Sequence, residues 1–141
     1  MIVYPDTSLL LPLYLIDSHT TQALQRLALR PVVLISPFHR AELTNAIYQQ
    51  VFRGEISAAE ARIAASNFER DCENGIFQSV ELPERLFVDC VHIAERRVAT
   101  LGVRTLDTLH VAAALELRAD RFWTFDQRQA RLAEAEGLAT T

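Results

Sequence analysis

The chain has 141 residues, half of them hydrophobic, so it is long and apolar enough to bury one core and too apolar to be disordered. Its formal net charge is −4, and all 14 basic residues are arginine. Because lysine is missing, enzyme classes that depend on one are excluded, including P-loop enzymes, Schiff-base enzymes and phospho-acceptor receiver domains. Arginine, which suits bidentate phosphate contacts, is the only permanently charged cation.

Apolar periodicity and turn residues predict alternating strands and helices. In chain order we expect a strand at residues 2–4, helices at 8–16 and 18–29, a strand at 32–35, helices at 37–53 and 58–74, a strand at 76–82, helices at 83–101 and 106–117, a strand at 121–125 and a helix at 127–136. Ser36, Ser57 and Thr105 are the expected N-caps of three of these helices. Residues 137–141 are too few to assign.

Strands separated by helices, with no hairpin turns between them, indicate βα units. We therefore expect an α/β domain over residues 1–141, with a mainly parallel sheet covered by helices on both faces. No internal repeat, linker or low-complexity segment divides it. Ligand sites in such folds lie at the carboxyl ends of the strands.

The sequence also bears on the compartment. The longest apolar run, residues 9–16, is about half a membrane span and contains Pro12, so no membrane segment is expected. The N-terminus has no basic region and carries Asp6 where a signal sequence is apolar. Cys72 and Cys90 match no metal or redox spacing. A reduced, cytoplasmic protein is expected.

Four acids fall at strand ends or in the first turns of helices: Asp6, Glu42, Asp107 and Asp126. Taken singly, each has a simpler explanation as a turn, cap, dipole partner or solvated residue. If the four converge, their repulsion requires a cation, and hard oxygen ligands select Mg²⁺ or Mn²⁺. Such a site activates water against a phosphodiester, which makes a metal-dependent nuclease the leading hypothesis. Asn45 continues the polar stripe of Glu42 and is expected to support it.

The segments DTSLL, HRAELTNA, RTLDTLHVAAAL and WTFDQRQ, in this order and spacing, resemble the PIN-domain ribonucleases, most of all the VapC-type toxins of bacterial toxin–antitoxin pairs. The resemblance covers essentially the whole chain. It implies a three-layer α/β/α fold with a central sheet of four or five strands. It also implies that the four acids are catalytic and hold Mg²⁺ or Mn²⁺, and that the hydroxyls of Ser8 and Thr124 support them.

The same resemblance implies an RNA substrate, a homodimer and an antitoxin whose C-terminal segment blocks the site. Two departures stand out: Pro5 removes a backbone donor beside Asp6, and the chain stops soon after Gly137, which leaves the fifth strand open. Two alternatives also stay open, an RNA-processing PIN nuclease without an antitoxin and a catalytically inactive binding scaffold. A haloacid-dehalogenase-type phosphatase is disfavoured, because Ser8 stands where it needs a second aspartate.

Histidines and arginines lie near the acids in sequence. His110 follows Asp107 by one helical turn among apolar residues, so we expect a buried supporting residue and not a catalytic base. No pattern connects His19, His39 or His92 with the acids. The arginines within three residues of an acid are Arg40, Arg104 and Arg128, and each is expected either to pair with the acids or to contact an RNA phosphate.

The net charge and the apolar residues bear on substrate and assembly. A chain with a net charge of −4 lacks the excess of positive charge with which an indiscriminate nuclease binds phosphates. We therefore expect folded RNA with an unpaired loop as the substrate. Residues 9–16 together with Phe38, Tyr48, Val51 and Phe52 either form an interface or fill the core.

Overall fold

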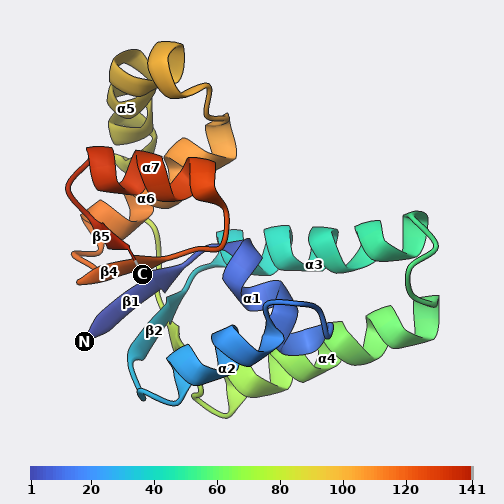
Figure 1. The fold of residues 1–141 in the computed structure, drawn as a ribbon. Helices are drawn as coiled ribbons and strands as arrows, with labels where there is room; N and C mark the ends of the chain where they lie inside the picture. Colours follow the sequence, from blue (N-terminus) through green and yellow to red (C-terminus); the bar gives the residue numbers. More distant parts are fainter. Residues whose placement is uncertain (141) are drawn as a thin grey trace.

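A five-stranded parallel sheet lies between two layers of helices in the computed structural model, which describes residues 1–140 (Figure 1). The strands are β1 (Ile2–Pro5), β2 (Val32–Ile35), β3 (Gln78–Ser79), β4 (Arg121–Trp123) and β5 (Ala139–Thr140). Their order in the sheet is β3-β2-β1-β4-β5, and every neighbouring pair is parallel. The expected three-layer α/β/α architecture is therefore confirmed.

Alternating strand residues face the two helix layers, as the period of two along a strand requires. Tyr4, Leu34 and Phe122 pack in one core with the helices α5 (Leu86–Leu101), α6 (Thr105–Glu116) and α7 (Gln127–Ala135). Val33 and Ile35 pack on the opposite face with α1 (Thr7–Tyr14), α3 (Pro37–Phe52) and α4 (Ala58–Glu73). Helix α2 (Thr20–Leu27) lies beside α1, and the α3–α4 pair extends beyond the sheet as an arm (Figure 1).

Most helix boundaries follow their predicted caps. Ser36 is the N-cap of α3 with Pro37 at the first helical position, and Ser57 forms a capping box with Glu60 at the start of α4. One cap was wrong: Thr105 is already helical, and Arg104 is the N-cap of α6. Asp107 explains the difference, because its carboxylate accepts a hydrogen bond of 2.8 Å from the backbone N–H of Arg104.

Several elements are shorter than predicted: α1 ends at Tyr14 and not at residue 16, and α2 spans Thr20–Leu27 and not 18–29. Strand β3 has two residues because only Leu34 and Ile35 of β2 pair with it. Helix α5 begins at Leu86 and not at Pro83, since residues 83–85 form a tighter turn with i→i+3 hydrogen bonds. Strand β4 ends at Trp123 because the N–H of Phe125 donates to the Ser8 hydroxyl, at 2.8 Å, and leaves the ladder.

The fifth strand forms after all: Ala139 and Thr140 pair with Arg121 and Phe122 of β4. Both cysteines are free and buried. Within residues 1–140, no helix combines the length and the apolar composition needed to cross a bilayer.

Candidate active site

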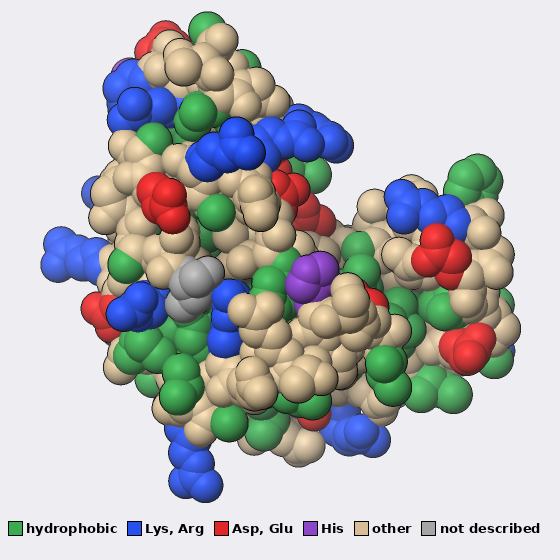
Figure 2. Space-filling model, in the orientation of Figure 1, with side chains coloured by type: hydrophobic (Ala, Val, Ile, Leu, Met, Phe, Trp, Pro, Cys, Tyr) green, Lys and Arg blue, Asp and Glu red, His purple; other side chains and the backbone are tan. Residues whose placement is uncertain are grey.

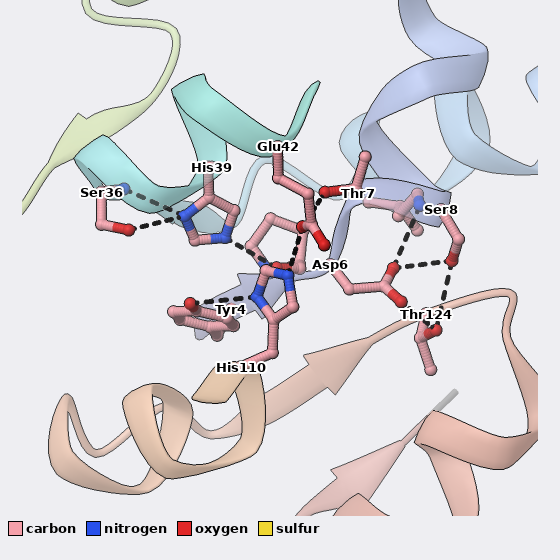
Figure 3. Close-up of polar contacts among 11 residues, drawn as sticks. Tyr4, Asp6, Thr7, Ser8, Ser36, His39, Glu42, His110 and Thr124 are labelled. Atoms are coloured by element: carbon pink, nitrogen blue, oxygen red, sulfur yellow. Dashed lines mark hydrogen bonds and ion pairs between the residues drawn. The ribbon is translucent and has the colours of Figure 1, made fainter. Parts of the chain in front are cut away.

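Asp6 lies at the carboxyl end of the central strand β1 and is the N-cap of α1. Its side chain is buried, with 2% of the residue exposed. The Ser8 hydroxyl donates to Oδ1 and the Thr124 hydroxyl donates to Oδ2, both at 2.6 Å, and the N–H of Leu9 donates to Oδ1 at 3.2 Å (Figure 3). Burial raises the pKa of Asp6, and nearby His110 and the hydroxyl donors only partly oppose that shift.

Thr124 connects Asp6 with Asp126. Its hydroxyl oxygen accepts a hydrogen bond of 2.9 Å from the backbone N–H of Asp126 while its proton is directed to Asp6. Asp126 is the N-cap of α7, and its Oδ1 accepts from the backbone N–H groups of Arg128 and Gln129 at 2.8 and 3.1 Å. The predicted cap role of Asp126 is therefore present, in a position that borders Asp6.

Glu42 reaches the same end of β1 from the second turn of α3. The hydroxyl of Thr7, next to Asp6, donates to Glu42 Oε2, and His110 Nε2 lies 2.5 Å from the same oxygen (Figure 3). Burial alone would raise the pKa of Glu42, but the hydrogen bonds from His110 and Thr7 outweigh it and hold the pKa below its usual value. Glu42 is thus a carboxylate fixed by two donors.

His110 is buried on α6 and contacts Glu42 with one ring nitrogen and Tyr4 with the other. Its Nδ1 lies 3.2 Å from the hydroxyl of Tyr4, and burial raises the pKa of Tyr4, so that this hydroxyl keeps its proton. The ring of His110 therefore bridges Tyr4 and Glu42 through its two nitrogens. His110 is thus buried, as predicted, and its ring contacts one of the four acids.

No pattern in the sequence connects His39 with the acids, but the structure places His39 against the residue that precedes Asp6. It is fully buried in the first turn of α3, and its Nε2–H donates to the backbone carbonyl of Pro5 at 2.8 Å. The proton is on Nε2 because Nδ1 accepts from the N–H of Ser36 at 3.0 Å. Burial, reinforced by the charge of His110, lowers the pKa of His39 to about 3, so this ring stays neutral. It anchors the residue before Asp6.

Asp107 and Asn45 lie at the margin of this arrangement. Asp107 occupies the first turn of α6, one turn before His110, and is partly exposed. Asn45 lies on the exposed side of α3, one turn after Glu42. Within residues 1–140, no three side chains among His, Cys, Asp and Glu lie close enough to form a metal cluster. The four acids thus lie around the carboxyl end of the sheet but do not form one compact metal-binding cluster.

The donor set nonetheless suits a hard divalent cation. Asp6 and Glu42 are carboxylates at the same strand end, and Mg²⁺ commonly takes one or two carboxylates, with water and substrate phosphate completing its octahedron. A bound cation would also offset the desolvation that raises the pKa of Asp6. Asp6 and Glu42 are the residues that could hold the metal, with Asp107 and Asp126 within the surrounding rim.

The three candidate arginines differ in their surroundings. Arg40 forms an ion pair with Glu69 of α4, and its guanidinium lies 6.0 Å from the centre of the Phe68 ring. The carboxylate partner of Arg40 is thus not one of the four acids. Arg104 is exposed and Arg128 is partly exposed, each at the N-terminus of its helix.

Tyr4, Thr7 and His39 contact the site but were missed by sequence reasoning. His39 had a local signal, because it occupies the third helical position after Ser36, where a capping box usually has Glu or Gln. Thr7 follows Asp6 directly and was read only as part of a motif. Tyr4 had no signal beyond its place on the inward face of β1.

Residues 3–135 match the PIN domain family. The chain belongs to the PIN-domain family. No curated protein sequence matches it.

Solved structures of PIN-family toxins share its fold. The sarcin–ricin-loop-cleaving toxin VapC20 of Mycobacterium tuberculosis has a TM-score of 0.71 and 17% identity, over 97% of this chain and 96% of that one. VapBC2 of Rickettsia felis, bound to a DNA fragment from its promoter, has a TM-score of 0.66 and 14% identity, over 100% and 98%. VapBC-1 of nontypeable Haemophilus influenzae has a TM-score of 0.65 and 15% identity, over 100% and 97%.

Proposed function

We propose that this PIN-domain protein is an endoribonuclease that depends on Mg²⁺ or Mn²⁺ and acts as the toxin of a toxin–antitoxin pair. The observation that carries the proposal is the buried carboxylate of Asp6, held by two hydroxyls at the carboxyl end of the central strand and flanked by Glu42. A buried carboxylate with a raised pKa costs stability when it is ionised, so its presence at a strand end favours a functional role.

Each residue has a distinct task in the proposed reaction. The metal, when bound, lowers the pKa of water and neutralises charge on the phosphodiester. Ser8 and Thr124 orient the two oxygens of Asp6, and His110 with Thr7 orients Glu42. Asp107 and Asp126 add negative charge at the rim, with one oxygen of each accepting backbone N–H groups.

The surface supports selective binding of folded RNA with an unpaired loop. Figure 2 shows a notch between the α3–α4 arm and the α5–α7 layer, with basic side chains along its upper border. The overall charge of −4 opposes indiscriminate binding, so selectivity rests on RNA shape and splayed bases. VapC20 is named for cleaving a loop, which favours a similar target.

Exposed apolar side chains support a homodimer and an antitoxin partner in the cytoplasm. Leu9 and Leu10 fill the core, whereas Ile16 and Phe52 are 93% and 87% exposed. Phe87, Val88 and Val91 of α5 form a second exposed apolar surface. Two separate surfaces suit two kinds of contact, and two structural neighbours were crystallised as VapBC pairs.

The test is cleavage by the purified chain of an end-labelled RNA hairpin with an unpaired loop. We expect cleavage with Mg²⁺ or Mn²⁺, little with Ca²⁺ and none in chelator, and no cleavage of single-stranded DNA of the same sequence. Full activity in chelator would overturn the metal mechanism. Recovery of a small co-expressed partner that inhibits cleavage separates a toxin from an RNA-processing nuclease.

A further inference from the structure

An exposed histidine ring lies flat on Phe125, beside the candidate active site. The ring centres of His19 and Phe125 are 4.5 Å apart and their planes differ by 25°, which is a stacked arrangement. His19 is exposed at the start of α2, whereas Phe125 is partly buried. Within residues 1–140, the His19 side chain forms no hydrogen bond, ion pair or second ring contact. One face of the imidazole therefore lies on Phe125, and the opposite face is open to solvent.

Phe125 connects this stack with Asp6. Its backbone N–H donates to the Ser8 hydroxyl at 2.8 Å, and the same hydroxyl donates to Asp6 Oδ1 at 2.6 Å (Figure 3). The ring of Phe125 packs against the buried side chains of Leu9 and Trp123. Phe125 is thus held next to the candidate active site both by its backbone and by its ring.

The loop that carries His19 is held by side-chain hydrogen bonds. The N–H of His19 donates to Asp17 Oδ1 at 2.7 Å, and the N–H of Asp17 donates to the Thr20 hydroxyl at 3.0 Å. The Thr20 hydroxyl in turn donates to the carbonyl oxygen of Pro12 at 2.8 Å, which attaches the loop to α1. The backbone of His19 is therefore ordered without a ligand, so that binding on its ring costs little conformational entropy.

An exposed flat ring on an anchored aromatic residue suits a nucleobase. Unpaired RNA bases stack on aromatic and histidine side chains, and this contact tolerates any base because every base has a π-face. A nucleobase is uncharged, so its stacking does not require an anion to be attracted beside Asp6 and Asp126. The chain has 18 acidic residues against 14 arginines, so contacts with bases are needed where attraction of phosphates is weak.

We infer that the stack of His19 on Phe125 binds an unpaired base of the RNA loop next to the phosphodiester that is cleaved, with the base on the open face of His19. The inference rests on the proposed function and deepens it, because it names a contact through which an unpaired loop is distinguished from a paired stem. If His19 only shielded Phe125 from water, an aliphatic side chain would serve equally well, and this difference can be tested.

The first experiment measures binding of a fluorescein-labelled RNA hairpin with an unpaired adenosine loop. It is done in Ca²⁺, which supplies a divalent cation for the acids and is expected to support little cleavage. His19→Ala should weaken binding about tenfold, the usual worth of one stacked base. His19→Leu still covers Phe125 but has no flat ring, and should weaken binding similarly, whereas His19→Tyr should bind nearly as tightly as the wild type. His92→Ala is the matched control, because His92 is exposed on α5.

A second measurement locates the base. Abasic nucleotides are placed singly through the loop, and one position next to the cleavage point should weaken binding to the wild type about tenfold but have little effect on His19→Ala. A loss of binding that came only from a disturbed fold would not depend on the position of the abasic nucleotide. Thermal unfolding checks that His19→Ala is folded, and the comparison of His19→Tyr with His19→Leu decides the question if it is not.

The possible outcomes separate the two proposals. If the wild type cleaves the hairpin with Mg²⁺ while His19→Ala and His19→Leu bind it as tightly as the wild type, the stack binds no base and the nuclease proposal stands. If the wild type binds the hairpin with the expected dependence on His19 but cleaves no RNA, the base contact is supported and the nuclease proposal fails. If the wild type binds no RNA, both proposals are overturned.

Discussion

His110 and Glu42 are hydrogen-bonded at 2.5 Å, and this contact joins helix α6 on one face of the sheet to helix α3 on the other, at the carboxyl end of β1. The bond fixes the Glu42 carboxylate at the same strand end as Asp6. On the other side of the ring, Nδ1 of His110 lies 3.2 Å from the Tyr4 hydroxyl.

Removal of this support should impair cleavage more than folding. Tyr4→Phe keeps the ring, which stacks on Phe122 at 5.9 Å, but frees Nδ1 of His110, so we expect an activity loss of about tenfold and a higher Mn²⁺ concentration for half-maximal activity. His110→Gln keeps an N–H toward Glu42 and should retain more activity than His110→Leu. Wild-type activity and metal response in His110→Leu would show that the contact has no part in positioning Glu42.

Acid should destabilise the protein through His39. Its pKa falls from 6.5 to about 3 on folding, so the unfolded chain takes up the proton first. The contribution is fully present above pH 6.5 and is lost as the pH falls toward 3, which amounts to about 2 kcal/mol between pH 7 and pH 5. Urea unfolding at these two pH values should show this loss in the wild type but not in His39→Gln.

Exposed His92 on α5 provides the control for that measurement. His92→Gln should keep the wild-type loss of stability between the two pH values. An unchanged loss in His39→Gln would mean that His39 is not held neutral by burial.

Removal of the Asp6 charge should stabilise the metal-free protein. Burial raises the pKa of Asp6, so the contribution of this group is most favourable below the pKa of the unfolded chain and is lost as the pH rises through the folded value. We expect Asp6→Asn to unfold at a higher temperature than the wild type at pH 7 in chelator, with a difference that narrows toward pH 4. A lower unfolding temperature at pH 7 would contradict a strained buried carboxylate.

Asp126 can be tested separately as a cap and as an acid. Asn is as good an N-cap as Asp, so Asp126→Asn should keep the stability of α7, whereas Asp126→Ala should lower the free energy of unfolding by about 1 kcal/mol. If the carboxylate serves catalysis, Asp126→Asn should still reduce cleavage. Full cleavage by Asp126→Asn would assign the residue to capping alone.

The features that could be predicted from the sequence are those that depend on residues close together in the chain. The strands β1, β2 and β4, the caps Ser36 and Ser57, and the placement of acids at strand ends all follow from local pattern and from the geometry of parallel sheets. Strand β5 could not be assigned because two residues carry no periodicity and form a strand only by pairing with β4.

Contacts between residues far apart in the chain could not be predicted from the sequence. Tyr4 meets His110 across 106 positions, and His110 meets Glu42 across 68, and no spacing rule predicts such pairs. The same holds for the arginines: proximity in sequence selected Arg40, whereas the fold pairs Arg40 with Glu69 and places Arg26 in one pocket with Thr124 and Asp126.

The central claim, an RNA-cleaving site built on Asp6, is tested most directly by mapping RNA 5′ ends across the cell shortly after induction of the wild type and of Asp6→Asn. We expect new ends at a few loop positions with the wild type and a loss of more than about a hundredfold with Asp6→Asn, because even supporting residues of metal sites are worth 10–100-fold. The same new ends with Asp6→Asn, or no new ends with the wild type, would contradict the claim.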